Sequence, residues 1–472
     1  MLDEVVREAA RRFGDTPALL TADDRLTYAE LDRRSDTVAG GLLALGVGPG
    51  DIVALTRRSD AGYLIALAAA AKVGAIAAGI NPSLAHAERR SLVDFLDPAV
   101  ELGDGELPEG DDAPVLPSDA DRPAVIVFTS GTTGPPKAAW FRSRELDAIR
   151  RIDLGVAADR WGGGAPMLAS TQFAHVGTTT KLPWYLRTGS TLVRVDPWRA
   201  DDVLEAVARH RIAHIGGVAP QIALLLRSPR FDELDLSCVS SLIVGGAASS
   251  PALVAEARAR FGAGYSIRYS STESGGVGLA TDPRADDDEL LHSIGRPRPG
   301  VEARLVDPET GDVIGDGEVG ELCLRSPAQM VGYWNRPDDT AATVVDGWVR
   351  SGDLALRDER GLYRLRGRIK EQYVRGGYNV APGEVEAVLA QHPRVRQVAV
   401  VPRADEVMGE IGVAVLVVDD PTSAPTLAEL RDHAAARLAK WKLPEDLVVV
   451  DALPLTAMQK VDRAALQALV QQ

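Results

Sequence analysis

Residues 125–137 read VIVFTSGTTGPPK. The apolar run at residues 125–128 predicts a buried strand, and hydroxyl-bearing residues and glycines follow it without a break. Hydroxyl groups, backbone N–H groups exposed by glycine and a lysine ammonium group all bind phosphate oxygens. We therefore predict a phosphate-binding loop that contains Thr129, Ser130, Gly131, Thr132, Thr133 and Lys137.

The loop differs from the common nucleotide P-loop, which needs a Gly-Lys-Ser/Thr sequence. Here Pro136 and Ala138 flank Lys137. A plain surface turn rich in Ser, Thr and Gly is the alternative, but the position directly after a strand favours phosphate binding.

The rest of the chain predicts an α/β fold. Short apolar runs at residues 192–195 and 242–244 are typical of further buried strands. Thr27 and Glu30 form a capping-box pattern that starts a helix. After Gly367 the elements become a smaller α+β unit, so we predict an N-terminal domain at residues 1–366, a hinge at 367–370 and a C-terminal domain at 371–472.

Composition narrows the class of protein. The chain has 472 residues and a formal net charge of −15, which argues against general binding to nucleic acids or anionic membranes. Only Cys238 and Cys323 are present, and this fits a reducing compartment. The N-terminal residues lack the pattern of a secretion signal, so we expect a cytoplasmic protein. Residues 63–80, the most apolar stretch, predict a buried helix and strand instead of a membrane span.

Further motifs follow in order: YSSTE at residues 269–273, WVRSGDL at 348–354, GRIKE at 367–371, GGYNVAPGEVE at 376–386 and PLTAMQKVDR at 454–463. Together with the phosphate-binding loop, they resemble the adenylate-forming superfamily of acyl-CoA synthetases, peptide-synthetase adenylation domains and beetle luciferases. Ser270 and Gln459 stand where that family usually has glycine. The resemblance covers nearly the whole chain and implies a large α/β N-terminal domain with a small mobile C-terminal domain.

The resemblance assigns nucleotide-binding roles to several residues. Tyr269 would lie against adenine, Thr272 would reach the α-phosphate region, and Glu273 would help to hold Mg²⁺. Asp353 would accept hydrogen bonds from both ribose hydroxyls, and Arg368 would touch ribose or phosphate. Each short motif taken alone also fits a structural role, such as a helix start at Thr272 or an ordinary turn at Asp353.

Three more segments would act in the reaction itself. Lys370 would be the pivot of domain rotation, and Gly376 and Gly377 would let pantetheine lie against the backbone. Lys460 would bridge the acid and the α-phosphate as the catalytic lysine.

Weaker matches concern the acyl pocket. His175 would lie near the substrate carboxylate, although a single histidine is more often structural. Gly246, Ala247 and Ala248 would pass between adenine and the acyl group, and residues 275–277 would leave room for a bulky acid. For Arg268 we expect an outward salt bridge, with a second substrate carboxylate as the alternative.

The predicted function is that of an ATP-dependent carboxylic acid–CoA ligase. It would form an acyl-AMP and pyrophosphate, and then an acyl-CoA thioester, using ATP, Mg²⁺ and coenzyme A. One alternative is a ligase that loads an acyl group onto a carrier protein. Another is a nucleotide-binding regulatory protein without turnover, and a kinase is disfavoured because a kinase motif set is missing.

Overall fold

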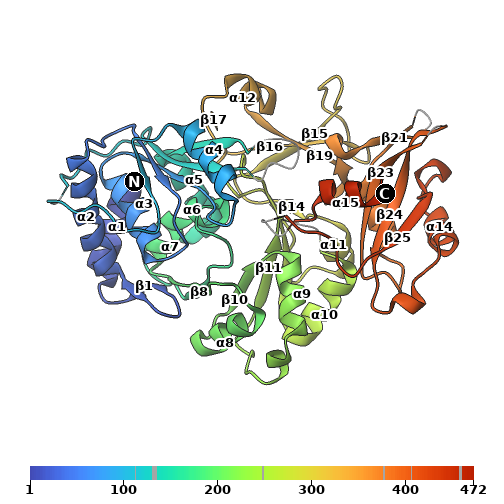
Figure 1. Cartoon of the computed structure of the whole chain (residues 1–472), viewed down its shortest axis with the longest axis horizontal. Coiled ribbons are helices and arrows are strands. Elements are labelled where there is room, and N and C mark those ends of the chain that lie inside the picture. The colour runs from blue at the N-terminus through green and yellow to red at the C-terminus, as the bar shows by residue number, and fades with distance from the viewer. Residues whose placement is uncertain are drawn as a thin grey trace.

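The structure is a computed structural model. It describes residues 1–111, 113–129, 136–246, 249–375, 378–405, 407–456 and 460–471, with the side chains of Lys370 and Asn379 left out. A large part contains the N-terminus, and a smaller part, orange to red in Figure 1, contains the C-terminus. The fold is therefore α/β with a large N-terminal domain and a small C-terminal one, as the sequence predicts.

One sheet of the large part carries the strand that leads into the predicted phosphate-binding loop. Its order is β17-β7-β6-β4-β3-β5, with bounds Gly332–Tyr333, Ala138–Arg142, Pro123–Phe128, Ile76–Gly79, Ile52–Leu55 and Val100–Leu102. β6, β4, β3 and β5 pair in parallel. Helices α3 (Ala61–Lys72) and α4 (His86–Leu96) connect these strands, so the predicted helix and strand within residues 63–80 are confirmed.

A second sheet positions two other predicted segments. Its order is β10-β11-β12-β13-β14, with bounds His214–Gly217, Ser241–Gly245, Gly264–Tyr269, Leu279–Ala280 and Arg296–Pro297. β10, β11 and β12 are parallel, so Gly245 and Tyr269 end neighbouring strands at one sheet edge, where α/β proteins bind ligands. Four helices accompany this sheet: α8 (Ala200–His210), α9 (Ala219–Arg227), α10 (Pro251–Phe261) and α11 (Asp287–His292).

The N-terminal segment completes the large part. A sheet in the order β2-β1-β9-β8 has the bounds Arg25–Thr27, Pro17–Leu20, Thr191–Val193 and Pro166–Leu168. Helices α1 (Leu2–Phe13), α2 (Tyr28–Ala44) and α7 (Leu182–Thr188) pack together beside it, whereas α5 (Ser143–Leu154) and α6 (Val176–Thr179) contact β7 and β6 of the first sheet. Thr27 caps α2 through the predicted capping box with Glu30.

A mostly antiparallel sheet follows and ends at the predicted hinge. Its order is β15-β16-β19-β18, with β20 paired to β19, and the bounds are Glu302–Val306, Gly320–Arg325, Trp348–Arg357, Val344–Val345 and Tyr363–Arg368. A short 3₁₀ turn, η3 (Ile369–Glu371), comes directly after β20, and α12 spans Pro337–Thr343.

The small part has a sheet and a core of its own. The sheet runs β22-β21-β24-β23 with β25 beside β24, and the bounds are Tyr378–Val380, Tyr373–Arg375, Gly409–Val417, Gln397–Asp405 and Asp446–Val449. Helices α13 (Pro382–Leu389), α14 (Leu427–Ala435) and α15 (Arg463–Val470) belong to this part. Strand pairing therefore passes from one sheet to the next between Arg368 and Tyr373, although the exact domain limits stay a prediction. Across the described residues, no helix is long and apolar enough to cross a membrane.

Candidate active site

Asp353 lies at the centre of a hydrogen-bonded group of predicted site residues. The pairing of β19 with β20 sets Asp353 directly opposite Arg368, whose Nε donates to Oδ1 of Asp353 at 2.7 Å. The Tyr269 hydroxyl donates to Oδ2 at 2.5 Å. Asp353 is 7% exposed, and burial, with this carboxylate next in effect, raises the pKa of Tyr269 well above its ordinary value. Tyr269 is thus a neutral donor to a buried carboxylate.

A second group joins the ends of the predicted phosphate-binding loop to Glu273. The backbone N–H of Lys137 donates to Oγ1 of Thr129 at 3.0 Å, which closes the loop at its base. The Lys137 ammonium lies 5.0 Å from the ring centre of Tyr333 and pairs with Asp339 at 2.5 Å. The Tyr333 hydroxyl donates to Oε1 of Glu273 at 2.7 Å.

Lys460 connects these groups with His175. Its charge is attracted by Asp353 and Glu273 and repelled by Arg368, while burial, the largest effect, lowers its pKa. The Thr456 N–H donates to the Lys460 carbonyl at 2.7 Å. Lys460 of the C-terminal segment therefore interacts electrostatically with residues of the large part.

His175 lies at the start of α6 and interacts electrostatically with Lys460. Burial, and next to it the charge of Lys460, lowers the pKa of His175 to about 4. The imidazole is therefore neutral near pH 7. A neutral histidine accepts or donates hydrogen bonds without adding a charge to the site.

The remaining predicted residues are located as follows. Thr272 lies in a turn closed by a hydrogen bond from Gly275 N–H to the Thr272 carbonyl at 3.0 Å, so it does not start a helix. Gly246 follows β11 with a φ of +77°, a conformation that favours glycine. The backbone of Lys370 lies in η3. The predictions for eight residues lie outside the described part: Ser130, Gly131, Thr132, Thr133, Ala247, Ala248, Gly376 and Gly377.

The surroundings of Arg268 differ from the expectation, and Tyr333 is a further residue of the site. Arg268 makes no outward salt bridge to any carboxylate of the described residues, and burial lowers its pKa. Tyr333 was not singled out from the sequence, because it lies 60 residues from Glu273 and no local spacing connects the two.

The described residues contain no group of three or more His, Cys, Asp or Glu side chains arranged to hold a metal ion. A divalent cation here would need oxygen ligands from a bound nucleotide in addition to Glu273. Mg²⁺ is commonly bound by one or two carboxylates with phosphates and water. The residues present fit that kind of binding.

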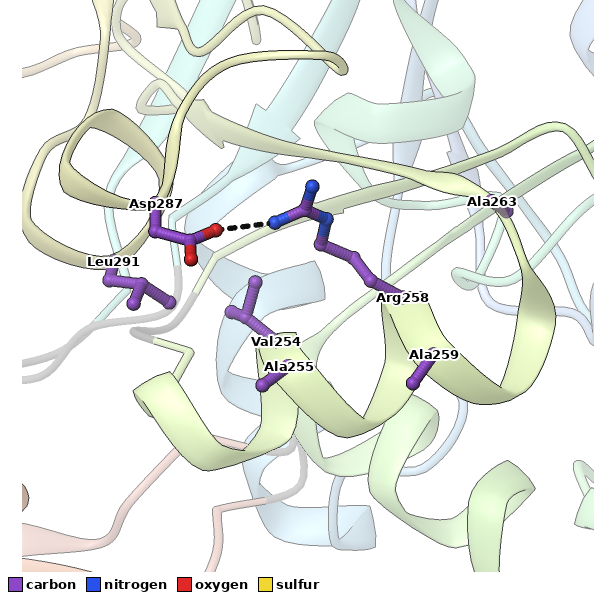
Figure 2. Close-up of a pocket in the computed structure, with 7 residues that line it drawn as sticks. All are labelled: Val254, Ala255, Arg258, Ala259, Ala263, Asp287 and Leu291. Carbon is purple, nitrogen blue, oxygen red and sulfur yellow. Dashed lines mark hydrogen bonds and ion pairs between the residues drawn. The ribbon is translucent and has the colours of Figure 1, made fainter.

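A surface hollow of about 400 Å³ lies elsewhere, between α10 and α11. Figure 2 shows Arg258 and Asp287 facing each other across it, with an ion pair of 2.6 Å. Its other lining residues are apolar, and none of the predicted site residues is among them. The hollow therefore has no part in the site around Asp353.

The chain is similar to known enzyme families and to individual enzymes. Residues 6–334 match the family described as AMP-binding enzyme, and residues 384–460 match the AMP-binding enzyme C-terminal domain. The chain is 32% identical to the fatty acid–[acyl-carrier-protein] ligase ScoC of Streptomyces coeruleorubidus, over 96% of this chain and 93% of that protein. It is 33% identical to a feruloyl-CoA synthase of an Amycolatopsis species, over 96% and 95% of the two chains.

Solved structures agree with these relatives. ATP-bound MatB from Rhodopseudomonas palustris superposes with a TM-score of 0.88 at 25% identity, over 100% of this chain and 99% of that one. The o-succinylbenzoate CoA synthetase MenE from Bacillus subtilis, in complex with its acyl-adenylate intermediate, gives a TM-score of 0.84 at 26% identity, over 98% and 97%.

Proposed function

The chain belongs to the AMP-binding enzyme family, and from that premise we propose that the site around Asp353, Glu273 and Lys460 performs both half-reactions of an acid–thiol ligase. The protein is an AMP-forming acyl-CoA synthetase. It couples ATP to the formation of an acyl-CoA thioester through an acyl-adenylate. The observation that carries the assignment of the site is that Lys460, from the C-terminal segment, interacts electrostatically with Arg368, Asp353 and Glu273, beside the hydrogen-bonded pair of Asp353 and Arg368.

In the first half-reaction, a carboxylate oxygen of the acid attacks the α-phosphorus of ATP, and pyrophosphate leaves. Negative charge gathers on the α-phosphate and the acid, and the Lys460 ammonium stabilises it while aligning both reactants. Asp353 accepts the ribose hydroxyls through lone pairs that its bonds to Tyr269 and Arg368 leave available, because each carboxylate oxygen accepts more than one hydrogen bond. Thr272 is assigned to the α-phosphate region.

The β- and γ-phosphates are assigned to the loop between Thr129 and Lys137. The loop ends are joined by two hydrogen bonds, Lys137 N–H to Thr129 Oγ1 and Thr129 N–H to the Lys137 carbonyl. Glu273 would hold Mg²⁺ together with phosphate oxygens, and the ion would neutralise charge on the leaving pyrophosphate. Tyr333 fixes the Glu273 carboxylate through its hydroxyl.

The second half-reaction needs another arrangement of the small domain. The thiolate sulfur of CoA attacks the acyl carbon, and AMP leaves. We assign Lys370 as the pivot between domains 1–366 and 371–472, and Gly376 and Gly377 as the surface for pantetheine. Rotation removes Lys460, whose electrostatic interactions with Asp353 and Glu273 are assigned to the adenylate-forming arrangement.

A carrier-protein thiol is the second candidate acceptor, and the relationship to ScoC favours it specifically. We also propose a cytoplasmic location, which the low cysteine content supports. Cytosolic thiols and nucleotides would both be available there.

The test combines two assays on the purified full chain over a panel of acids. Acid-dependent exchange of pyrophosphate into ATP reports adenylate formation, and loss of free CoA thiol reports the acceptor. Exchange with thiol loss supports the proposal. Exchange without CoA consumption, but with acylation of an added phosphopantetheinylated carrier, would favour the carrier protein. Absence of exchange with every acid would favour a regulatory nucleotide-binding protein.

A further inference from the structure

Three cationic side chains lie around one carboxylate beside the site. Both carboxylate oxygens of Asp153, in α5, accept hydrogen bonds. Oδ2 accepts one from Lys181 Nζ at 2.7 Å, and Oδ1 accepts one from Arg298 Nη1 at 2.6 Å. All three side chains are largely buried, at 13%, 10% and 18% exposed. Burial raises the pKa of Asp153, but the charges of Lys181 and Arg298 outweigh it, and the pKa is lowered overall. Asp153 is thus ionised and fully engaged.

Arg268 is the third cation, and no carboxylate of the described residues forms an ion pair with it. It belongs to β12, directly before Tyr269. Arg298 repels the positive charge of Arg268, and Asp153 attracts it only at longer range. Arg268 in turn disfavours the charged form of Lys181. In the described part of the chain, no Asp or Glu lies within ion-pairing distance of its guanidinium. The cluster therefore holds three positive charges against one negative charge.

Gly245, at the end of β11, lies beside Arg268. β11 pairs with β12 so that Gly245 is opposite Arg268, and a Cβ on Gly245 would lie 3.4 Å from the Arg268 Cβ. It would also lie 2.7 Å from the Arg268 carbonyl oxygen, so a side chain at Gly245 would crowd Arg268, and glycine avoids this. Gly245 also begins the loop that we assign to the acyl group.

The loop after Glu273 borders the same cations. Gly276 has a φ of +71°, and a Cβ there would lie 3.2 Å from Val176 Cγ2 and 3.6 Å from Lys181 Cε. Lys181 Nζ donates to the Gly276 carbonyl at 3.1 Å. Val176 directly follows His175. The loop therefore lies between the charge cluster and His175, which we assign to the substrate carboxylate that is activated.

We propose that the acid activated by this enzyme carries a second carboxylate, and that Arg268 binds it. The proposal rests on the proposed function. A partly buried guanidinium without an anion is unfavourable, and a planar carboxylate offers it two parallel hydrogen bonds. The first carboxylate of the acid meets Lys460 and ATP, while the second lies near Arg268, with Lys181 and Arg298 adding to the positive field. Arg268 acts as a residue that determines specificity and takes no part in bond formation.

The alternative for Arg268 is contact with the phosphates of the nucleotide, because Tyr269 is its neighbour. The two roles have different consequences. A nucleotide contact affects every acid equally, whereas a contact with a second carboxylate affects only acids that carry one.

The experiment uses matched acids on the full-length enzyme. Straight-chain diacids of four to eight carbons and the aromatic diacid phthalate are each compared with their monomethyl esters, which keep the size and remove one charge. Pyrophosphate release gives kcat/KM for each acid at saturating ATP. We expect at least one diacid to exceed its own ester by about 10- to 100-fold. Substitution Arg268→Met should abolish this preference through a higher KM for the diacid, and leave kcat/KM for the ester within about threefold.

Arg258→Met is the control, because Arg258 has a single ion pair at the surface hollow of Figure 2. It should keep the diacid preference. Equal loss of activity toward diacids and esters in Arg268→Met would overturn the proposal in favour of a nucleotide contact. Activation of esters or simple monocarboxylic acids as efficiently as diacids by the wild-type enzyme would overturn it without any variant, and would leave the proposed function standing. Failure of all acids would overturn the proposed function too.

Discussion

The hydroxyl group of Tyr269 donates a 2.5 Å hydrogen bond to Oδ2 of Asp353, a residue 84 positions further along the chain. The bond joins the end of a parallel strand to the middle of an antiparallel one. It fixes the tyrosine ring assigned to adenine relative to the carboxylate assigned to ribose. The two groups therefore hold each other in place, and Arg368 supports Asp353 from the opposite oxygen; we propose that they bind the nucleoside as one unit.

Loss of this bond should weaken ATP binding more than it weakens the fold. In Tyr269→Phe, Asp353 loses one of its two side-chain donors, and a buried bond to a charged acceptor contributes about 2 kcal/mol. We expect the KM for ATP to rise roughly 10-fold, with the melting temperature a few degrees lower. Initial rates at varied ATP and thermal unfolding measure the two effects.

Tyr363→Phe provides the matched control. The Tyr363 hydroxyl donates to the Ala303 carbonyl at 3.0 Å, at the other end of β20. Its loss should lower the melting temperature and leave the KM for ATP unchanged. A lower melting temperature without any change in the KM for ATP in Tyr269→Phe would contradict the assignment of Asp353 to ribose.

Glu273→Gln should change the magnesium requirement. The amide oxygen still accepts the hydrogen bond from Tyr333, but the negative charge that would bind the ion is lost. We expect the Mg²⁺ concentration for half-maximal pyrophosphate release to rise on the order of 10-fold, with partial recovery at high Mg²⁺. Glu256→Gln, on the exposed face of α10, should behave as the wild type. A normal Mg²⁺ requirement in Glu273→Gln would remove Glu273 as a ligand.

The sequence predicts features that depend on neighbouring residues better than features that depend on residues far apart in the chain. The Thr27–Glu30 capping box and the strand before Thr129 depend on neighbouring residues, and both are confirmed in α2 and β6. The pairing of Asp353 with Arg368 depends on strand register, which no short motif contains. The resemblance supplied both residues, but not their mutual contact.

Of the charge cluster, the sequence singled out Arg268 alone, with a second substrate carboxylate as the alternative to a salt bridge, and the other members could not be predicted. Asp153 meets Lys181 across 28 positions and Arg298 across 145, so nothing in the local pattern connects them. Among the described residues the expected outward salt bridge of Arg268 is not found, for the same reason: its surroundings come from three separate segments. Only the folded arrangement shows that Asp153 is already occupied.

His175 should remain neutral far below the ordinary histidine range. Its pKa is lowered to about 4, first by burial and then by Lys460, whereas an unfolded chain titrates near pH 6.5. The unfolded state therefore binds a proton that the folded state refuses, and this residue contributes a loss of stability as the pH falls from about 6.5 toward 4. NMR of ¹⁵N-labelled histidines, assigned with His175→Gln, measures the titration.

Removal of the lysine charge tests the contact itself. Lys460→Met should raise the pKa of His175 while burial keeps it below the ordinary value. Lys440→Met, an exposed lysine of the same domain, should leave it unchanged. An unaltered His175 titration in Lys460→Met would show that the lysine does not approach the histidine in solution.

Lys460→Ala should separate the two half-reactions. The ammonium group interacts electrostatically with Glu273 and Asp353 in the arrangement described, and we propose that it stabilises charge only while the acid attacks the α-phosphate. We expect adenylate formation to fall roughly 100- to 1000-fold, while thioester formation from supplied acyl-AMP and CoA stays within about threefold of the wild type. Pyrophosphate exchange and thiol loss measure the two steps, with Lys440→Ala as the control. Equal loss of both would mean that Lys460 supports the fold or a shared binding step, and that the domain does not move it away before the thiol attacks.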